Sequence, residues 1–388
     1  MIEEIEKSFL FYFGTHPTLI VRSPGRINLI GEHTDYNGGF VLPAAVDKSI
    51  VLAFGPRQDS EVRLQALNLN DFYHLTKGPF KITNKKSGKG WPDYVLGVLL
   101  ELEKLNLKWS GFNCTIGGDL PLGAGMSSSA ALECGILFGL NRLFNHRLKP
   151  REIALLAQKA ENEFVGVKCG IMDQFANVFG RKGNALRLDC SSQDFEYVPF
   201  THEGIDIVLC DTGVKHSLAG SEYNARRKEC EKGVAAMRFL NPDISNLRKA
   251  SLKELSFVKE KISKQAYRRC KYVIDENARV IDACKDLKEN DLVGFGQKMF
   301  ATHEGLRNEY SVSCPELDFL VDLARKADGV LGARMMGGGF GGCTINLVKK
   351  NDTAEFLRIA ANAYQSEFGI PLQSYQVELA DGVHLVKR

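Results

Sequence analysis

The pattern of apolar and polar positions predicts strands and helices mixed along the whole chain. Short alternating or continuously apolar runs predict strands at residues 19–22, 49–54, 62–66, 112–116, 185–188 and 205–210. Apolar positions three and four residues apart predict helices at residues 94–105 and 152–164, and a nearly uncharged run predicts a buried helix at 130–144. Residues 221–287 have the pattern of a long helical region, which includes an amphipathic run. No internal repeat or low-complexity linker interrupts the chain.

The length of 388 residues exceeds that of a typical single core, so two domains are expected. The polar stretch at residues 190–203 is the most natural boundary, which divides the chain into residues 1–195 and 196–388. Hydrophobic residues at 44% and charged residues at 25% are typical of a soluble globular protein.

Charge and cysteine usage narrow the functional classes. A net charge of +3 without long basic runs disfavours a nucleic-acid partner, and no apolar run reaches membrane-spanning length. The N-terminus does not resemble a signal peptide. The ten cysteines are scattered and form no Cys-x-x-Cys pair, which favours reduced thiols over disulfides or a zinc site. We therefore expect a cytoplasmic protein without a membrane partner.

The most informative motif is a glycine- and serine-rich loop between the predicted strand at 112–116 and the buried helix, Gly123-Ala124-Gly125-Met126-Ser127-Ser128-Ser129. Such a loop gathers free backbone N–H groups and the positive end of a helix dipole, which suits a phosphate group. The serine hydroxyls add donors and a possible oxygen ligand for Mg²⁺. A glycine turn with serines that cap a helix explains the loop equally well.

A second motif spans residues 24–39 and places Arg26, Glu32, His33 and Asp35 among four glycines. Carboxylates accept hydrogen bonds from sugar hydroxyls, and histidine can donate or accept, so the cluster suits a polyhydroxylated ligand. The alternative is a solvated loop with local ion pairs. It is the weaker interpretation, because the charged residues follow an apolar strand and lie among chain-reversing glycines.

Two further motifs contain carboxylates and glycines. Glu161 and Asp173 flank a glycine-bounded turn, and each could be a metal ligand, a proton acceptor, or only a helix-end charge or cap. Asp173 is the better functional candidate because its neighbours Ile171 and Met172 suggest partial burial. The five glycines within residues 337–342 suit close approach of the backbone to a ligand or another loop, although a wide bend between strands remains open.

Together and in this order, the four motifs resemble those of the galactokinases, within the galacto-, homoserine, mevalonate and phosphomevalonate kinase family. The resemblance runs from Val21 to Leu385. Residues 25–36 are similar to the galactokinase signature, residues 121–131 to the family's phosphate loop, and residues 169–174 and 220–227 to further galactokinase segments. The family implies two α+β domains, one like domain 2 of ribosomal protein S5 and the other a C-terminal α/β sandwich. The active site is expected in the cleft between them.

The resemblance also implies an activity, the transfer of a phosphoryl group from ATP to the anomeric hydroxyl of α-D-galactose. It assigns the sugar site to Glu32, His33, Thr34, Asp35, Gly170, Asp173 and Tyr223. It assigns the triphosphate to residues 123–129, the adenine to Trp91 and Tyr94, and Mg²⁺ to Ser129 and Glu161. Asp173 would accept or orient the hydroxyl proton, and Arg26 would stabilise the transferring phosphoryl group. Without the resemblance, Trp91 would be taken for a core residue.

Two residues depart from the family pattern. Met126 replaces the usual leucine and conserves apolar volume, and Met336 replaces a threonine and removes a hydroxyl. Two other activities fit much of the pattern: an N-acetylgalactosamine kinase, and a sensor that binds galactose and ATP and regulates transcription through a partner. The glycines at 337–339 favour galactose over the first, and the complete serine run disfavours the second. A monomer is expected.

Overall fold

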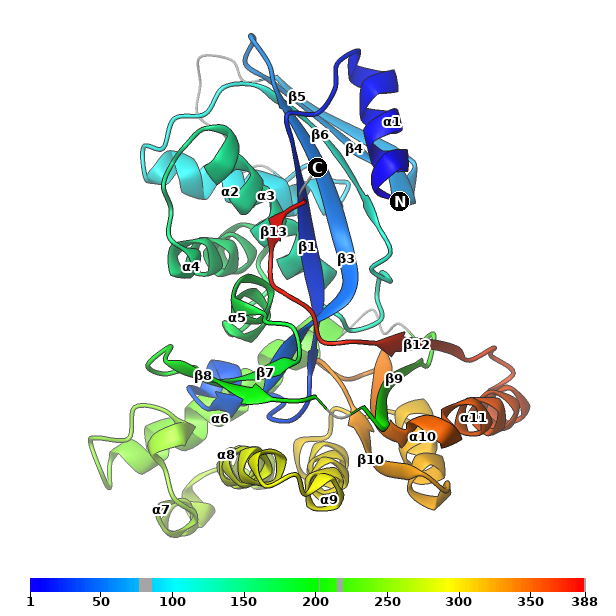
Figure 1. Cartoon of the computed structure of the whole chain (residues 1–388). Helices are drawn as coiled ribbons and strands as arrows, with labels where there is room; N and C mark the ends of the chain where they lie inside the picture. Colours follow the sequence, from blue (N-terminus) through cyan, green and yellow to red (C-terminus); the bar gives the residue numbers. More distant parts are fainter. Residues whose placement is uncertain (77–85, 202, 215–218, 387–388) are drawn as a thin grey trace.

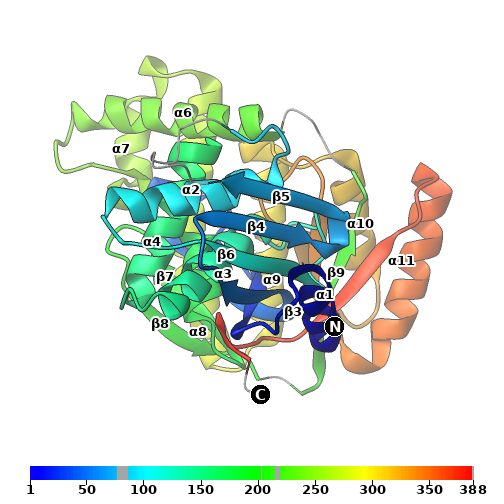
Figure 2. The same cartoon turned by 90° about the horizontal axis from the view of Figure 1, so that it is seen from above.

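The computed structural model describes residues 1–76, 86–201, 203–214 and 219–386. Its first part is built on a six-stranded sheet (Figures 1 and 2). The strands lie in the order β13 (His384–Leu385), β1 (Leu19–Asn28), β3 (Pro43–Pro56), β6 (Phe112–Gly118), β4 (Glu61–Ala66) and β5 (Asp71–Thr76). Neighbouring strands are antiparallel except β4 and β6, which are parallel.

Helices cover the two faces of this sheet unequally. Helix α1 (Ile2–Phe13) lies on one face, and the other face carries the remaining four helices (Figure 1). These are α2 (Trp91–Lys104), α3 (Ser128–Leu143), α4 (Pro150–Ala160) and α5 (Met172–Phe179). Helix α3 packs so closely on β3 that a Cβ at Gly139 would overlap the ring of Phe54. The serine run lies at the opposite end of this helix, at its N-terminus.

Two smaller sheets and six further helices complete the described part of the fold. A four-stranded sheet has the order β10 (Val330–Met335), β11 (Cys343–Lys349), β9 (Ile205–Asp211) and β12 (Gln373–Val377). A three-stranded sheet has the order β2 (Phe40–Val41), β7 (Asn184–Asp189) and β8 (Phe195–Pro199). The helices are α6 (Ala219–Arg238), α7 (Leu252–Phe257), α8 (Lys264–Lys288), α9 (Leu292–Glu304), α10 (Pro315–Lys326) and α11 (Thr353–Phe368).

Each of the six predicted strands and the helices at 94–105 and 130–144 is present. Residues 221–287 are helical over most of their length, as predicted, but the region is divided among three helices. The chain turns after α6 at Asn241-Pro242, and Ser251 and Ser263 then cap two new helices, α7 and α8. The predicted helix at 152–164 ends as α4 at Ala160 and continues as a π-helical turn, Glu161–Val165. Strand β8 lies inside the polar stretch at 190–203, where the sequence favours the domain boundary.

The C-terminal segment returns from the second part of the chain to the first. After β12, Leu379 bridges to Val46, and β13 then pairs with β1 (Figure 1). The division after residue 195 stays a prediction, and residues 387–388 lie outside the described part. Among the described residues, no helix is both long and apolar enough to cross a membrane.

Candidate active site

The serine run occupies the N-terminus of α3, at the end of a loop held by residues with positive φ. Gly123 and Gly125 have φ of 84° and 74°, and Ser127, at the cap position of α3, has φ of 55°. Ser127 makes no capping hydrogen bond with its side chain. Instead, its hydroxyl donates to Oδ2 of Asp173 at 2.5 Å. The interpretation of this serine as a simple helix cap is therefore wrong, because its hydroxyl faces another part of the chain.

Arg26 and Asp173 form the centre of the site. The guanidinium of Arg26, on β1, donates to both carboxylate oxygens of Asp173, on the first turn of α5, at 2.7 and 2.9 Å. Arg26 also donates to the carbonyl of Gly125, and its backbone N–H donates to the carbonyl of Met126 at 3.1 Å. A strand, the glycine- and serine-rich loop and α5 thus meet at one bidentate ion pair, the arrangement in which arginine binds carboxylates most strongly.

A polar cavity of about 160 Å³ opens beside this ion pair. It is lined by Arg26, Glu32, His33, Asp35, Glu161, Val167, Cys169, Met172, Asp173, Tyr223, Gly337 and Gly338. Most of the residues assigned to the sugar by resemblance therefore come together. Gly170 lies behind Asp35, and a Cβ there would overlap the Asp35 carboxylate. Thr34 does not line the cavity, because its hydroxyl donates to the carbonyls of Gly31 and Phe40 and braces the loop from inside.

The titratable groups of the cavity are strongly perturbed. Burial lowers the pKa of His33 to about 3, so the imidazole is neutral. Burial, and next the charge of Asp173, raises the pKa of Asp35 to about 7. His33 also has φ of 62°, a conformation that costs free energy and persists where the surroundings enforce it. Perturbed groups in a concave site are a physical signature of function.

Glu161 lies next to the serine run and is a candidate metal ligand. It begins the π-helical turn after α4, accepts a hydrogen bond from Gln174 at 2.9 Å and is hydrogen-bonded to Ser129. Burial, and next the charge of Asp173, raises its pKa to about 7. A buried carboxylate beside a hydroxyl suits a hard cation. Burial, reinforced by Glu161, also raises the pKa of Glu133, which the sequence analysis did not single out.

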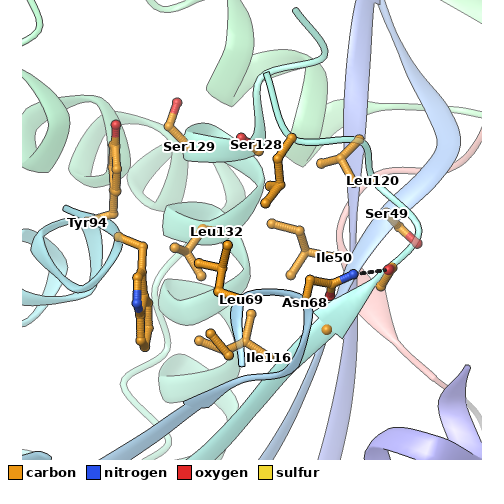
Figure 3. A pocket seen from close by; sticks show the side chains of 15 residues that line it. Ser49, Ile50, Asn68, Leu69, Tyr94, Ile116, Leu120, Ser128, Ser129 and Leu132 are labelled. Carbon is orange, nitrogen blue, oxygen red and sulfur yellow. Dashed lines mark hydrogen bonds between the residues drawn. The ribbon is translucent and has the colours of Figure 1, made fainter. Parts of the chain in front are cut away.

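A second pocket, mostly apolar and of about 130 Å³, lies on the other side of the serine run (Figure 3). Trp91 and Tyr94 line it together with Ser128, Ser129, Leu132 and residues of β3, β4 and β6. Trp91 is partly buried rather than part of the core, and its indole N–H donates to Asp71 at 2.9 Å. An apolar pocket lined by two aromatic side chains suits a planar base.

Residues that the sequence pattern does not single out hold the loop at residues 24–39 in place. Helix α8 provides Tyr272, which donates to the carbonyl of Glu32 at 3.1 Å, and Glu276, which accepts from the N–H of Gly31 at 2.9 Å. Arg334 on β10 pairs with Glu32 at 3.1 Å. A charged residue in an otherwise apolar strand was the only sequence signal for Arg334, and the amphipathic pattern of α8 gave none.

Three family descriptions match this chain. The galactokinase galactose-binding signature matches residues 7–56, and the GHMP kinase N- and C-terminal domains match residues 93–181 and 283–366. A galactokinase of Roseiflexus is 40% identical over 381 residues, which cover 98% of this chain and 96% of the relative. One of Thermotoga maritima is 41% identical over 366 residues, with 94% and 99% covered. The chain belongs to the galactokinase family.

Solved structures agree with membership of the galactokinase family. The crystal structure of Lactococcus lactis galactokinase complexed with galactose has a TM-score of 0.93 and 35% identity, with 99% of each chain covered. The mevalonate kinase of Methanococcus jannaschii shares the fold, with a TM-score of 0.66 and 23% identity over 94% of this chain and 98% of that one. The predicted fold class, an α+β kinase of two domains, is confirmed.

Proposed function

We propose that this chain transfers the terminal phosphoryl group of ATP to the anomeric hydroxyl of α-D-galactose. The products are galactose 1-phosphate and ADP, in the first committed step of galactose catabolism. The position of the serine run is the observation that supports this most strongly. Ser128 and Ser129 line the apolar pocket, whereas Ser127 donates to Asp173 in the polar cavity. The run therefore joins a base-shaped pocket to a polar one, as phosphoryl transfer between two substrates requires.

In this proposal Asp173 is the catalytic residue that receives the proton of the anomeric hydroxyl. Its carboxylate is oriented by two hydrogen bonds from Arg26 and one from Ser127. Arg26 and the free N–H groups at the start of α3 stabilise the negative charge of the transferring group. Glu32, His33, Asp35 and Tyr223 bind the other sugar hydroxyls. A neutral His33 can both donate and accept, which suits hydroxyl groups.

The residues also fit a magnesium ion that accompanies ATP. Ser129 and Glu161 would hold it, and the ion would neutralise charge on the phosphates. Two protein ligands suffice, because Mg²⁺ keeps several waters and binds phosphate oxygens. The fit rests on the buried carboxylate of Glu161, whose pKa is raised to about 7 and which a cation would stabilise in its charged form.

The test is ADP release by the purified protein with galactose and ATP, with and without Mg²⁺. We expect turnover that needs both galactose and the metal. Absence of turnover from folded protein contradicts the proposal, and retained binding of both ligands then favours the sensor. N-acetylgalactosamine serves as the second acceptor, and turnover that matches galactose favours the N-acetylgalactosamine kinase instead.

We also propose a cytoplasmic location and a monomeric state. All ten cysteines are free, which suits a reducing compartment. Analytical ultracentrifugation tests the oligomeric state directly.

A further inference from the structure

Arg334 on β10 is the largest side chain in the described part of the chain that is fully buried, with 0% exposure. Its guanidinium donates to the carbonyls of Leu29 at 3.0 Å, Met335 at 2.6 Å and Asn28. It also donates to Oε1 of Glu32 at 3.1 Å. A buried guanidinium needs a charge partner, and Glu32 is the only carboxylate with which Arg334 forms an ion pair among the described residues.

Glu32 is held by one of its two carboxylate oxygens. Oε1 accepts from Arg334 and also from the backbone N–H of Gly337 at 2.7 Å. Oε2 accepts no hydrogen bond from the described residues, although Glu32 lines the polar cavity. The side chain itself is only 2% exposed, so it has little freedom to turn. With Oε1 fixed twice, the direction in which Oε2 points is fixed as well.

We propose that Arg334 is a positioning residue for recognition of the sugar. It fixes Glu32 so that Oε2 accepts a hydrogen bond from one particular hydroxyl of the acceptor. The guanidinium of Arg334 also donates to the carbonyls of Asn28 and Leu29. It therefore fixes the position of the Glu32 carboxylate relative to the backbone at the start of the loop that carries Glu32. The inference rests on the proposed function, since it requires a sugar in this cavity.

The test measures kcat/KM for galactose and for its monodeoxy analogues, each lacking one hydroxyl. In the wild-type protein, loss of the hydroxyl that Glu32 binds should lower kcat/KM by about ten- to a hundredfold or more, because the site is built to pair it. In Arg334→Gln, we expect this preference to fall to within about threefold, while KM for ATP stays within about twofold. Arg334→Lys should keep part of the preference, since a single ammonium group replaces the planar guanidinium and its several donors.

A second variant keeps the test decisive if Arg334→Gln does not fold. Glu32→Gln leaves an oxygen for Arg334 and Gly337 and places an NH₂ group where Oε2 was, so it should lose the preference for the same hydroxyl. Arg57→Gln is the matched control. It breaks a partly buried arginine ion pair with Asp59 and Glu61, outside the cavity, and should leave every ratio unchanged.

Two results overturn the inference. One is a loss in Arg334→Gln that is the same for galactose and every analogue, since a purely structural arginine would act in this way. The other is an unchanged hydroxyl preference in Glu32→Gln. Both are distinct from failure of the proposed function, which appears as absent turnover in the wild-type protein.

Discussion

Asp35 provides a direct test of the electrostatics of the sugar cavity. Its carboxylate lies in the same cavity as Glu32 and Asp173, against the backbone of Gly170. Burial, and next the charge of Asp173, raises its pKa from 3.8 to about 7. The folded protein therefore binds this proton more tightly than the unfolded chain does. The stability that the protonated carboxyl contributes is complete below pH 3.8 and is lost as the pH rises through about 7.

The Asp35→Asn variant removes this titration while conserving shape. A shift from 3.8 to about 7 corresponds to about 4 kcal/mol in total, of which about 2.5 kcal/mol falls between about pH 5 and pH 8. Contact with water in the cavity screens the charge, so we expect about 1 to 2.5 kcal/mol. Relative to the variant, the wild-type protein should thus lose that amount of unfolding free energy as the pH rises from about 5 to about 8.

Urea unfolding without ligands, followed by circular dichroism at several pH values, gives the difference between the two proteins. Taking the difference removes the contribution of other titrating groups that both proteins share. Thr34→Ser is the control in the same loop, and its difference from the wild-type protein should not change with pH, because neither side chain titrates. A flat difference for Asp35→Asn, or one that grows in the opposite direction, refutes the assignment of a raised pKa to Asp35.

Three further substitutions separate the roles of the two pockets. Asp173→Ala should lower kcat by at least about a hundredfold while ATP still binds in a nucleotide-binding assay, and near-normal turnover contradicts its role. Gly170→Ala should raise KM for galactose by about tenfold or more, with KM for ATP unchanged, because the added Cβ overlaps the Asp35 carboxylate. Trp91→Ala should raise KM for ATP by about tenfold, since stacking on a base contributes about 1 to 3 kcal/mol, and leave KM for galactose unchanged. A larger change for galactose would place Trp91 outside the nucleotide site.

The sequence was most informative where local rules decide the structure. The apolar run at 130–144 forms the buried helix α3, and the glycines at 123 and 125 before it have positive φ. Short apolar or alternating runs located strands such as β6 and β9, most of whose residues are buried on both faces. Periodicity identified residues 221–287 as helical but did not locate the breaks within them, after which Ser251 and Ser263 cap new helices. The regular spacing of apolar residues favoured a continuous helix more strongly than the two serines favoured new helix starts.

The candidate site was predictable only in part, for a different physical reason. Its reactive residues lie in dense motifs, but the residues that orient them lie far away in sequence. Arg334 is 302 residues from Glu32, and Glu276 is 245 residues from Gly31. No local propensity records such contacts. The role of Ser127 could not be predicted either. A serine that precedes a helix gives the same sequence pattern when its hydroxyl caps the helix as when the hydroxyl donates to Asp173.

The two pockets differ in how widely their supporting residues are spread along the chain. This difference limits which substitutions can change the acceptor specificity. The apolar pocket is lined by residues between Ser49 and Leu132, whereas the loop at residues 24–39 depends on α8 and β10. Exchanging the loop without Arg334 would leave a fully buried guanidinium without its carboxylate, and breaking a buried pair costs about 3 to 5 kcal/mol. The loop and the residues of α8 and β10 that hold it therefore depend on one another. A new acceptor specificity on this fold requires changes to both together.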